Sequence, residues 1–383
     1  MRMIQGEPRR ALFVARPNRF VVRCILDGKM TDAYLPNPGR LWELLLPDCP
    51  LYLSENRAGV KLPYTVVAME KEGTPILLHT HLANDVAAFL LGSGLVPGLE
   101  DVRIVKREVA FGKSRFDFLL EKDGRTMVLE IKNCTLFSDR LAMFPDAVTR
   151  RGSRHLEGLM RLASSGIRAG VLFLVQWPYA QYFMPEYHTD LVFSETFLKC
   201  RDRIFLEALA LKWNSDLSLD RDVRKLVIPW RTIERKSRDR GCYILILRLG
   251  NDAVVMTGGL GNVFFRKGYY LYAGSAKRAL TKRMERHARR RKNLFWHIDY
   301  LREKATFCRA LAIRTDSDIE CALAADLKRI SHWSVPGFGC SDCACKSHLF
   351  GMDTNPLHSS PFLDVLYNYR IGSVEGELDD GDD

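Results

Sequence analysis

No apolar run in this 383-residue chain approaches the roughly 18 residues that a membrane-spanning helix requires. The first eight residues, MRMIQGEP, lack the apolar core of a secretion signal. We therefore expect a cytoplasmic protein that does not associate with membranes. Cysteines close to one another in sequence are also scarce, because seven of the ten have no nearby cysteine partner. This pattern favours reduced thiols and does not indicate a disulfide framework.

Acidic residues are outnumbered by basic ones. The chain has 57 Lys and Arg against 46 Asp and Glu, a net charge of +11, and its sequence pI is about 9.2. This balance favours a polyanionic partner. The excess is concentrated at 277–292, where nine of sixteen residues are Lys or Arg. The last eleven residues instead contain six acids, and we expect them to form a disordered, solvated tail.

A glycine-rich phosphate-binding loop is also absent, so nothing in the sequence indicates a small-molecule enzyme of a sugar pathway. The hydrophobic content of 47% and the charged content of 27% are those of an ordinary globular protein. The length predicts two to three domains.

The N-terminal part reads as short strands separated by loops that contain Pro or Gly. Several short strands within about 70 residues predict a small barrel of the oligonucleotide-binding kind over residues 10–80. The apolar runs that carry this prediction are 20–26, 51–53, 64–69 and 76–78.

The next part, residues 81–213, has a different pattern and predicts an α/β domain. Helical periodicity is present at 82–91 and 147–164, and a continuous apolar run at 170–175 predicts a buried strand. The fold class predicted for the chain is α/β with several domains. Its remaining parts are a polar linker at 214–240, a third α/β unit at 241–352, and a C-terminal segment with the acidic tail at 353–383.

Asp123-Gly124, between two apolar-rich runs, is a strong signal for a two-residue hairpin. This turn pairs the flanking strands so that Asp117 lies opposite Glu130, with Arg115 and Lys132 on the same face. Facing carboxylates about 5 Å apart would repel one another, and a divalent cation between them would remove that repulsion. Lys132 would then orient a water or stabilise developing charge. The alternative is an exposed ladder of salt bridges on the same face.

Residues 10–212 resemble the sugar fermentation stimulation protein A family. The resemblance implies an oligonucleotide-binding barrel, a domain like the PD-(D/E)xK nucleases, and a DNA-binding protein with a suggested regulatory role in sugar metabolism. It also implies that Asp117 and Glu130 bind Mg²⁺ or Mn²⁺, that Lys132 serves the attacking water, and that Glu108 is an additional metal ligand. The matching motifs are PNPGRLWEL (36–44), SRFDF (114–118), EIK (130–132), FPDA (144–147), RG (151–152) and HL (155–156).

The third unit resembles GIY-YIG nuclease-like domains, with Gly241-Cys242-Tyr243 and Tyr272-Ala273-Gly274 in place of the two motifs. Such a site needs a phenol to take a proton from water, an arginine to neutralise phosphate and a carboxylate to bind a cation. Two other interpretations stay open: the tyrosines pack across a small sheet, and the basic segment is a solvated helical face. The residues implied as catalytic are Tyr243, Tyr272, Arg283 and Glu320, with Glu320 as the metal ligand and His287 as a relay.

A cysteine-rich segment follows at 339–348. Three cysteines and a histidine, namely Cys340, Cys343, Cys345 and His348, could complete a tetrahedral zinc site. However, Cys343 and Cys345 are separated by one residue, and zinc knuckles usually draw on two separated pairs. We therefore favour a structural turn or a thiol site over zinc.

The leading hypothesis is a DNA-binding endonuclease that depends on Mg²⁺ or Mn²⁺ and grips the DNA backbone with little sequence preference. The competing hypothesis is a non-catalytic DNA-binding regulator that keeps nuclease folds without turnover. The residues expected to contact DNA are Arg40, Arg115, Lys277, Arg278, Lys282, Arg286 and Arg290.

Overall fold

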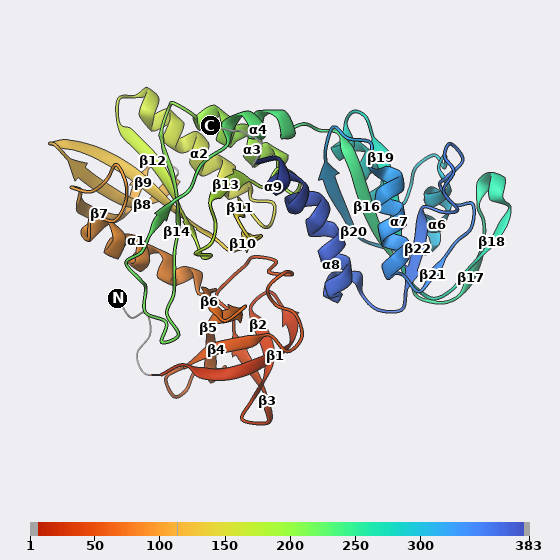
Figure 1. The fold of residues 1–383 in the computed structure, drawn as a ribbon, viewed down its shortest axis with the longest axis horizontal. Coiled ribbons are helices and arrows are strands. Elements are labelled where there is room, and N and C mark those ends of the chain that lie inside the picture. Colours follow the sequence, from red (N-terminus) through yellow and green to blue (C-terminus); the bar gives the residue numbers. More distant parts are fainter. Residues whose placement is uncertain (1–6, 113, 379–383) are drawn as a thin grey trace. The chain divides into compact units, whose positions relative to one another are not determined.

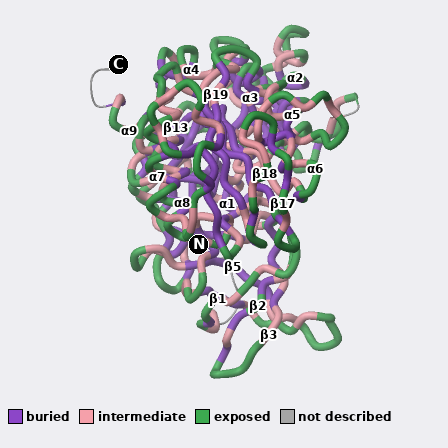
Figure 2. Tube along the Cα trace, turned by 90° about the vertical axis from the view of Figure 1, so that its right-hand side faces the viewer, coloured by how far each residue is buried: buried purple, intermediate pink, exposed green. Residues whose placement is uncertain are grey.

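The computed structural model describes residues 7–112 and 114–378 (Figure 1). The chain forms two compact units. The first contains the described residues up to Glu186 and Val192–Ile233, and the second contains Tyr187–Leu191 and the described residues from Glu234 onward. Buried stretches follow the central strands of the chain, whereas loop tips such as the one between β2 and β3 are exposed (Figure 2). Within the described ranges, no helix combines the length and apolar character needed to cross a bilayer.

The first unit begins with the expected small barrel, which is closed. Its strand order is β3-β2-β1-β4-β5-β6, and a parallel β3–β5 pairing joins the two ends of a five-strand ring. Asp27 and Gly28 both have positive φ, 49° and 74°, as a two-residue hairpin loop between β2 and β3 requires. The strands are β1 (Arg9–Asn18), β2 (Val21–Leu26), β3 (Lys29–Tyr34), β4 (Pro50–Glu55), β5 (Tyr64–Lys71) and β6 (Thr74–Leu77).

An α/β domain completes the first unit. Its six-stranded sheet has the order β15-β14-β12-β9-β8-β7, in which β12 runs parallel to β9 and β14. A smaller sheet has the order β10-β11-β13. The elements are η1 (Thr80–Leu82), α1 (Ala83–Gly92), β7 (Arg103–Phe111), β8 (Ser114–Lys122), β9 (Arg125–Cys134), β10 (Leu136–Phe137), β11 (Leu141–Phe144), α2 (Arg150–Ser164), β12 (Arg168–Val175), β13 (Tyr182–Pro185), α3 (Leu191–Cys200), β14 (Phe205–Ala210), β15 (Arg224–Lys225) and α4 (Trp230–Lys236).

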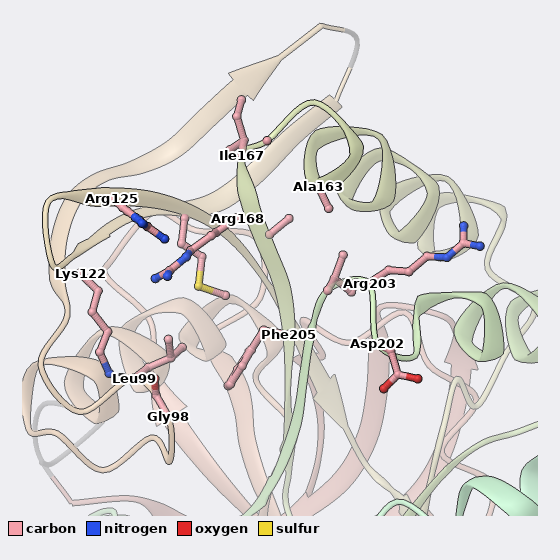
Figure 3. A pocket seen from close by; sticks show the side chains of 14 residues that line it. Gly98, Leu99, Lys122, Arg125, Ala163, Ile167, Arg168, Asp202, Arg203 and Phe205 are labelled. Carbon is pink, nitrogen blue, oxygen red and sulfur yellow. Dashed lines mark hydrogen bonds between the residues drawn. The ribbon is translucent and has the colours of Figure 1, made fainter.

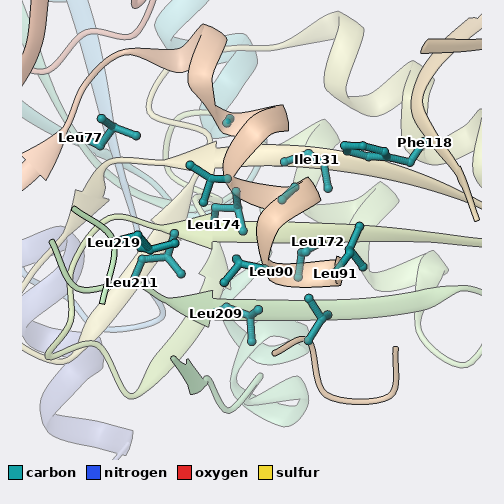
Figure 4. Close-up of a cluster of buried hydrophobic side chains, with 14 of the residues drawn as sticks. Leu77, Leu90, Leu91, Phe118, Ile131, Leu172, Leu174, Leu209, Leu211 and Leu219 are labelled. Atoms are coloured by element: carbon teal, nitrogen blue, oxygen red, sulfur yellow. The ribbon is translucent and has the colours of Figure 1, made fainter. Parts of the chain in front are cut away.

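Helices α1 and α2 hold the central strands in place. Leu90 and Leu91 of α1 pack with Phe118, Leu172 and other apolar side chains of the sheet in one continuous core (Figure 4). Helix α2 packs against β8 and β12. It begins three residues later than expected, because Thr149 caps it and its side chain accepts the Gly152 N–H at 3.0 Å.

The second unit is built on a five-stranded sheet in the order β20-β16-β19-β22-β21. Strand β16 pairs antiparallel with both β19 and β20, so it lies inside the sheet, and its residues are buried except Gly241 and the exposed Arg248. The elements are β16 (Gly241–Leu249), β17 (Ala253–Met256), η2 (Gly258–Leu260), β18 (Asn262–Phe265), β19 (Gly268–Ala276), α5 (Leu280–Ala288), α6 (His297–Lys304), β20 (Thr306–Arg314), α7 (Glu320–Ile330), β21 (Trp333–Ser334), β22 (Leu349–Met352), η3 (Pro356–His358), α8 (Ser360–Tyr367), η4 (Asn368–Gly372) and α9 (Ser373–Glu377).

The structure corrects the disorder expected at the start of the acidic tail and adds detail to other segments. The linker at 214–240 is partly ordered, because β15 pairs with β14 and α4 follows. The segment after 352 belongs to the second unit, and the tail is helical at its start, where Val374 and Leu378 are buried; residues 379–383 lie outside the described chain. Tyr187–Leu191 belongs to the second unit, where the Arg314 N–H donates to His188. The basic segment 277–292 is helical only over α5.

Candidate active site

The hairpin between β8 and β9 has the predicted register. Lys122 pairs with Arg125, and the ladder continues to the pair Phe118–Leu129. Asp123 and Gly124 have φ of 53° and 70°, which is the left-handed conformation that a tight primed turn needs at both positions. The next positions are Asp117 and Glu130, where the backbone ladder ends. The hairpin therefore delivers the two carboxylates to the place where the strands part.

Asp117 is fixed by two hydrogen bonds at this break in the ladder. Its Oδ2 accepts the Ile131 N–H at 2.7 Å, and its Oδ1 accepts from Asn84 Nδ2 of α1 at 2.8 Å. Burial and the neighbouring charge of Glu130 raise the pKa of Asp117. The two acids therefore interact unfavourably, as the sequence predicted.

Glu130 is 3% exposed and its two oxygens differ sharply. Oε1 accepts from both Lys132 Nζ and His155 Nδ1. Oε2 is buried and has no hydrogen-bond partner among the described residues. Burial raises the pKa of Glu130, but hydrogen bonds from His155 and Lys132 outweigh it and leave the pKa below its ordinary value. Glu130 is thus held as a carboxylate with one free, buried oxygen.

His155 is a site residue to which we assigned no role from the sequence. It lies on α2 and is 6% exposed, and its Nε2 accepts from Arg151 Nε at 3.3 Å. Gly158 lets the helix approach the sheet, since a Cβ there would stand 3.0 Å from the Phe116 ring. The sequence signal for His155 was the helical spacing that places it on the same face as Leu156, Leu159 and the other buried residues of α2.

Glu108, predicted as a metal ligand, and Arg115, predicted as a DNA contact, form an ion pair with each other. Their side chains are 59% and 65% exposed, and the Glu108 backbone has a φ of 56°. Because this pair lies at the surface, Glu108 is not held with the buried acids. Arg115 is paired with Glu108, whereas the Asp117 carboxylate accepts hydrogen bonds from Asn84 and the Ile131 N–H. These contacts do not favour a salt-bridge ladder at this end of the hairpin.

Arg40 lies in the loop of the PNPGR motif, which is tied to the α/β domain of the same unit. Its backbone N–H donates to Asp146 Oδ2 at 2.7 Å, and its guanidinium stacks 5.0 Å from the Trp42 ring centroid. Gly39 is required there, because a Cβ would stand 2.4 Å from Asp146 Oδ2. The Arg16 guanidinium donates to the Gly39 and Arg40 carbonyls at 2.7 Å.

A cavity of about 550 Å³ lies at the other end of the sheet, beside the Asp123-Gly124 turn. Lys122, Arg125, Arg168 and Phe205 are among the residues that line it (Figure 3). Lys122 Nζ donates to the Gly98 carbonyl at 3.0 Å. This cavity does not include Asp117 or Glu130, so it is separate from the acidic pair.

The second unit brings most of its predicted residues together. The Tyr243 hydroxyl lies 3.0 Å from His287 Nε2, and the Tyr243 and Tyr272 ring centroids are 6.3 Å apart. The positive charge of Arg283 lowers the pKa of both phenols, and the negative charge of Glu320 raises it. Burial is the main cause that raises the pKa of both tyrosines, and burial lowers the pKa of His287.

The predicted DNA-contacting residues of the second unit fall into two groups. Arg286 is bound to Asp299 at 3.0 Å and lies over Trp296, so its contacts favour a structural role over phosphate binding. Arg290 lies beyond α5 and is exposed. The others in the exposed group are Lys277, Arg278 and Lys282.

The cysteine-rich segment differs from its prediction in one residue. Among the described residues, one group of Cys, His, Asp or Glu side chains has metal-binding spacing, and it contains Cys321, Cys343, Cys345 and His348. Cys340 is not part of it. Helix α7 contributes Cys321, which lies too far along the chain for local spacing to indicate.

Three family models match this chain. The model described as "SfsA N-terminal OB domain" matches residues 14–78, and the one described as "Sugar fermentation stimulation protein RE domain" matches residues 81–216. The model "Domain of unknown function DUF123" matches residues 242–367.

Curated relatives match about half of this chain or more. The sugar fermentation stimulation protein homolog of Methanothermobacter thermautotrophicus is 37% identical over 232 residues, which are 60% of this chain and 96% of the relative. The homolog of Moorella thermoacetica is 42% identical over 190 residues, which are 49% of this chain and 82% of that protein. A solved structure of Pyrococcus furiosus SfsA in complex with Ca²⁺ is 28% identical, with a TM-score of 0.55, and the match covers 60% of this chain and 99% of that one.

Proposed function

The chain belongs to the sugar fermentation stimulation protein family, and we propose that its first unit is a divalent-cation-dependent endonuclease that hydrolyses phosphodiester bonds in DNA. The observation that carries the proposal is the buried Glu130 carboxylate, whose Oε2 has no hydrogen-bond partner among the described residues. A buried charged oxygen without a partner is costly. A cation bound at that oxygen would offset the cost and would also relieve the repulsion from Asp117.

The donor set fits Mg²⁺ or Mn²⁺, because carboxylate oxygens are the ligands that these hard cations prefer. Asp117 and Glu130 would hold the cation. When bound, it would polarise the phosphate and lower the pKa of a bound water. The description of the P. furiosus relative as a Ca²⁺ complex supports an oxygen-ligated cation in a chain of this fold.

Two side chains prepare Glu130 for this role. His155 Nδ1 and Lys132 Nζ both bind Oε1, so they fix the carboxylate with Oε2 turned away from them. The Lys132 side chain is 15% exposed, which leaves its ammonium able to reach a phosphate or an attacking water. We propose that Lys132 orients that water or stabilises the charge that develops on the phosphate.

DNA is the proposed substrate because of the excess positive charge of +11. Phosphates would be contacted by exposed basic side chains just before α5, at its start and beyond its end. Arg40 and Arg115 of the first unit would add further contacts. Such contacts carry no sequence information, so we expect binding that weakens steeply with salt and shows little sequence preference.

The test measures cation binding and cleavage on the same full-length variants. The wild-type protein should nick supercoiled plasmid with Mg²⁺ or Mn²⁺ and should be stabilised against heating by Ca²⁺. Asp117→Asn and Glu130→Gln should lose the Ca²⁺ stabilisation and the share of nicking that the first unit catalyses, because each removes a negative oxygen ligand. Glu121→Gln is the matched control: it lies on the same hairpin and pairs with Arg103 at the surface, so it should retain both.

Two outcomes count against the proposal. Salt-sensitive DNA binding without nicking in any divalent metal would favour the competing function, a DNA-binding regulator without turnover. Ca²⁺ stabilisation that survives in both acid variants would place the cation elsewhere.

The second unit is a further candidate for hydrolysis, and its GIY-YIG-like cluster of Tyr243, Tyr272, Arg283 and Glu320 favours it. Gly274 admits Tyr243 to this cluster, since a Cβ at Gly274 would stand 2.5 Å from the Tyr243 hydroxyl. We propose that this unit binds DNA phosphates and that Tyr243, with His287 as its hydrogen-bond partner, takes the proton from water.

A comparison of a single and a double variant tests the second centre. If the second centre is active, Asp117→Asn should leave residual nicking. The double variant Asp117→Asn with Tyr243→Phe should then lose the remaining activity. Phenylalanine keeps the ring packing and removes only the hydroxyl. Complete loss of nicking in Asp117→Asn alone would show that the second unit does not cleave DNA, and electrophoretic mobility shifts would then measure its contribution to binding.

A further inference from the structure

The second unit contains a group of three thiols and one imidazole. The ligand atoms of Cys321, Cys343, Cys345 and His348 all lie within 4.8 Å of one another. Ligand atoms of a tetrahedral zinc ion with Zn–S bonds of about 2.3 Å are separated by about 3.8 Å, so a bound ion would draw these atoms together by about 1 Å at most. We propose that these four side chains bind a structural zinc ion, independently of the carboxylate site in the first unit.

The histidine is oriented as a metal ligand would be. His348 is 1% exposed; its Nδ1 lies 3.1 Å from Glu320 Oε1, and its Nε2 lies 3.5 Å from Cys343 Sγ. Metal-binding histidines typically donate the other ring N–H to a carboxylate, which fixes the tautomer and leaves the opposite nitrogen for the ion. Glu320 supplies that carboxylate, and Nε2 faces the cysteines.

The backbone holds this arrangement at the start of β22. The His348 N–H donates to the Phe338 carbonyl at 2.8 Å, and the His348 carbonyl accepts the Ala273 N–H at 3.0 Å. Cys321 lies in the first turn of α7, directly after Glu320. The helix therefore presents one ligand together with the carboxylate that orients another, while the loop before β22 presents the remaining two cysteines.

Four protein ligands leave no open coordination position, so the ion would have a structural role. It would fasten the loop at 335–348 to α7. This loop packs on the predicted tyrosine cluster, because a Cβ at Gly339 would stand 2.7 Å from the Tyr272 ring. The proposal also assigns Glu320 a different role: its Oε1 orients His348, so Glu320 acts here as a positioning residue for zinc.

Cys321 distinguishes this ligand set from the one predicted from sequence spacing, which contained Cys340 in its place. The full-length protein, purified with a reductant and without chelators, should contain about one zinc per chain. Replacement of zinc by Co²⁺ should produce the intense visible absorption of a tetrahedral cobalt–thiolate site. Cys321→Ser should lose the zinc and this absorption. Cys340→Ser is the matched control, since Cys340 lies in the same loop but outside the group, and it should keep both.

Glu320→Gln tests the orientation of His348 separately. We expect zinc affinity, measured by competition with a chromophoric chelator, to fall by a factor of about 10–100 while the stoichiometry is kept. Hydrogen exchange of the loop at 335–348 should slow when zinc is added to chelator-treated wild-type protein. A variant that fails to fold would be recognised by the loss of protection in β16.

The proposal is overturned by any of three results. The first is metal-free protein with a Cys343–Cys345 disulfide in mass spectrometry after zinc has been offered under reducing conditions. The second is zinc retained in Cys321→Ser and lost in Cys340→Ser. The third is a cobalt spectrum that lacks thiolate-to-metal charge transfer.

Discussion

Replacing Lys132 with glutamine is expected to lower the rate of metal-dependent DNA cleavage by a factor of about 10²–10³, the range typical of removing one group that stabilises charge in the transition state. The Lys132 ammonium is bound to Glu130 Oε1 and is the cation held closest to the buried carboxylate. Glutamine keeps most of the length of the side chain but can neither carry the charge nor donate a proton at neutral pH. The loss should therefore appear in kcat.

Cation binding should respond differently. Without Lys132, Glu130 keeps His155 on Oε1 and retains its free Oε2. Because one neighbouring positive charge has been removed, the carboxylate should attract a divalent cation at least as strongly as before. Calorimetric titration with Ca²⁺ should consequently give a dissociation constant that is unchanged or lower in Lys132→Gln, even though nicking has almost disappeared.

Lys122→Gln is the matched control for this prediction. Lys122 lies on the same hairpin, and its ammonium binds the Gly98 carbonyl at 3.0 Å and Glu100 at 3.6 Å, at the opposite end of the strand. This variant should cleave DNA at a rate close to that of the wild type. Equal losses in the two variants would attribute the effect to weaker DNA binding, and a parallel loss of Ca²⁺ binding in Lys132→Gln would indicate that the lysine only supports the fold of the site.

The acidic pair could be predicted because turn chemistry is local. Two residues that accept a positive φ fix the register of a hairpin, and side-chain alternation then assigns every residue to a face. What alternation could not show was that the ladder ends at Phe118–Leu129. Beyond that pair the Ile131 N–H bonds to the side chain of Asp117, so the acids lie at a parting of the strands.

The partners of the pair come from distant segments. Asn84 reaches Asp117 from α1, and His155 reaches Glu130 from α2. Both contacts depend on how the helices pack on the sheet. A single sequence shows which residues share a face of a helix, but it does not show the angle at which that helix crosses the sheet. A buried histidine beside leucines on a helix is compatible with a purely structural role. The sequence alone therefore gave no reason to assign His155 a functional role.

The cysteine group shows the same limit in a different form. Spacing within 339–348 placed Cys340 with Cys343 and Cys345, because residues close in sequence were the natural candidates. In the structure the group contains Cys321 and not Cys340. Cys321 lies in the first turn of α7, and the rest of that helix and β21 separate it from Cys340 in the chain. Ligand sets that join two elements are set by tertiary packing, and local spacing finds only part of them.

Asp299 is a further buried group, to which the sequence analysis assigned no role. It is fully buried and binds Lys292 Nζ at 2.8 Å and Arg286 Nη1 at 3.0 Å. It also accepts the Phe295 and Trp296 N–H groups at 3.1 Å and thereby caps α6. His287 Nδ1 lies 3.4 Å from its Oδ1, which links this network to Tyr243.

Asp299→Asn is expected to destabilise the second unit by about 3–5 kcal/mol, because it removes the negative charge that Arg286 and Lys292, two partly buried cations, both bind. Burial raises the pKa of Asp299, but His287, Lys292 and backbone hydrogen bonds outweigh it and lower the pKa well below the ordinary value. A carboxyl with a lowered folded pKa stabilises the fold above its unfolded pKa of about 3.9 and loses this contribution as the pH falls further. The wild-type second unit should therefore lose stability below about pH 4, and the difference between wild type and Asp299→Asn should shrink there.

Native-state hydrogen exchange measures this effect in the presence of an internal reference. Amides of β16 and β19 should exchange faster in Asp299→Asn, whereas amides of β9 and β12 in the first unit should be unaffected. Asp316→Asn is the matched control, since Asp316 pairs with Arg240 at the surface and its side chain is 42% exposed; surface pairs contribute about 0–1 kcal/mol. If Asp299→Asn were no more destabilising than Asp316→Asn, the buried network would not hold α5 and α6 together. The position of His287 behind Tyr243 would then have to depend on the apolar packing of the unit, and the predicted proton relay would lose its structural support.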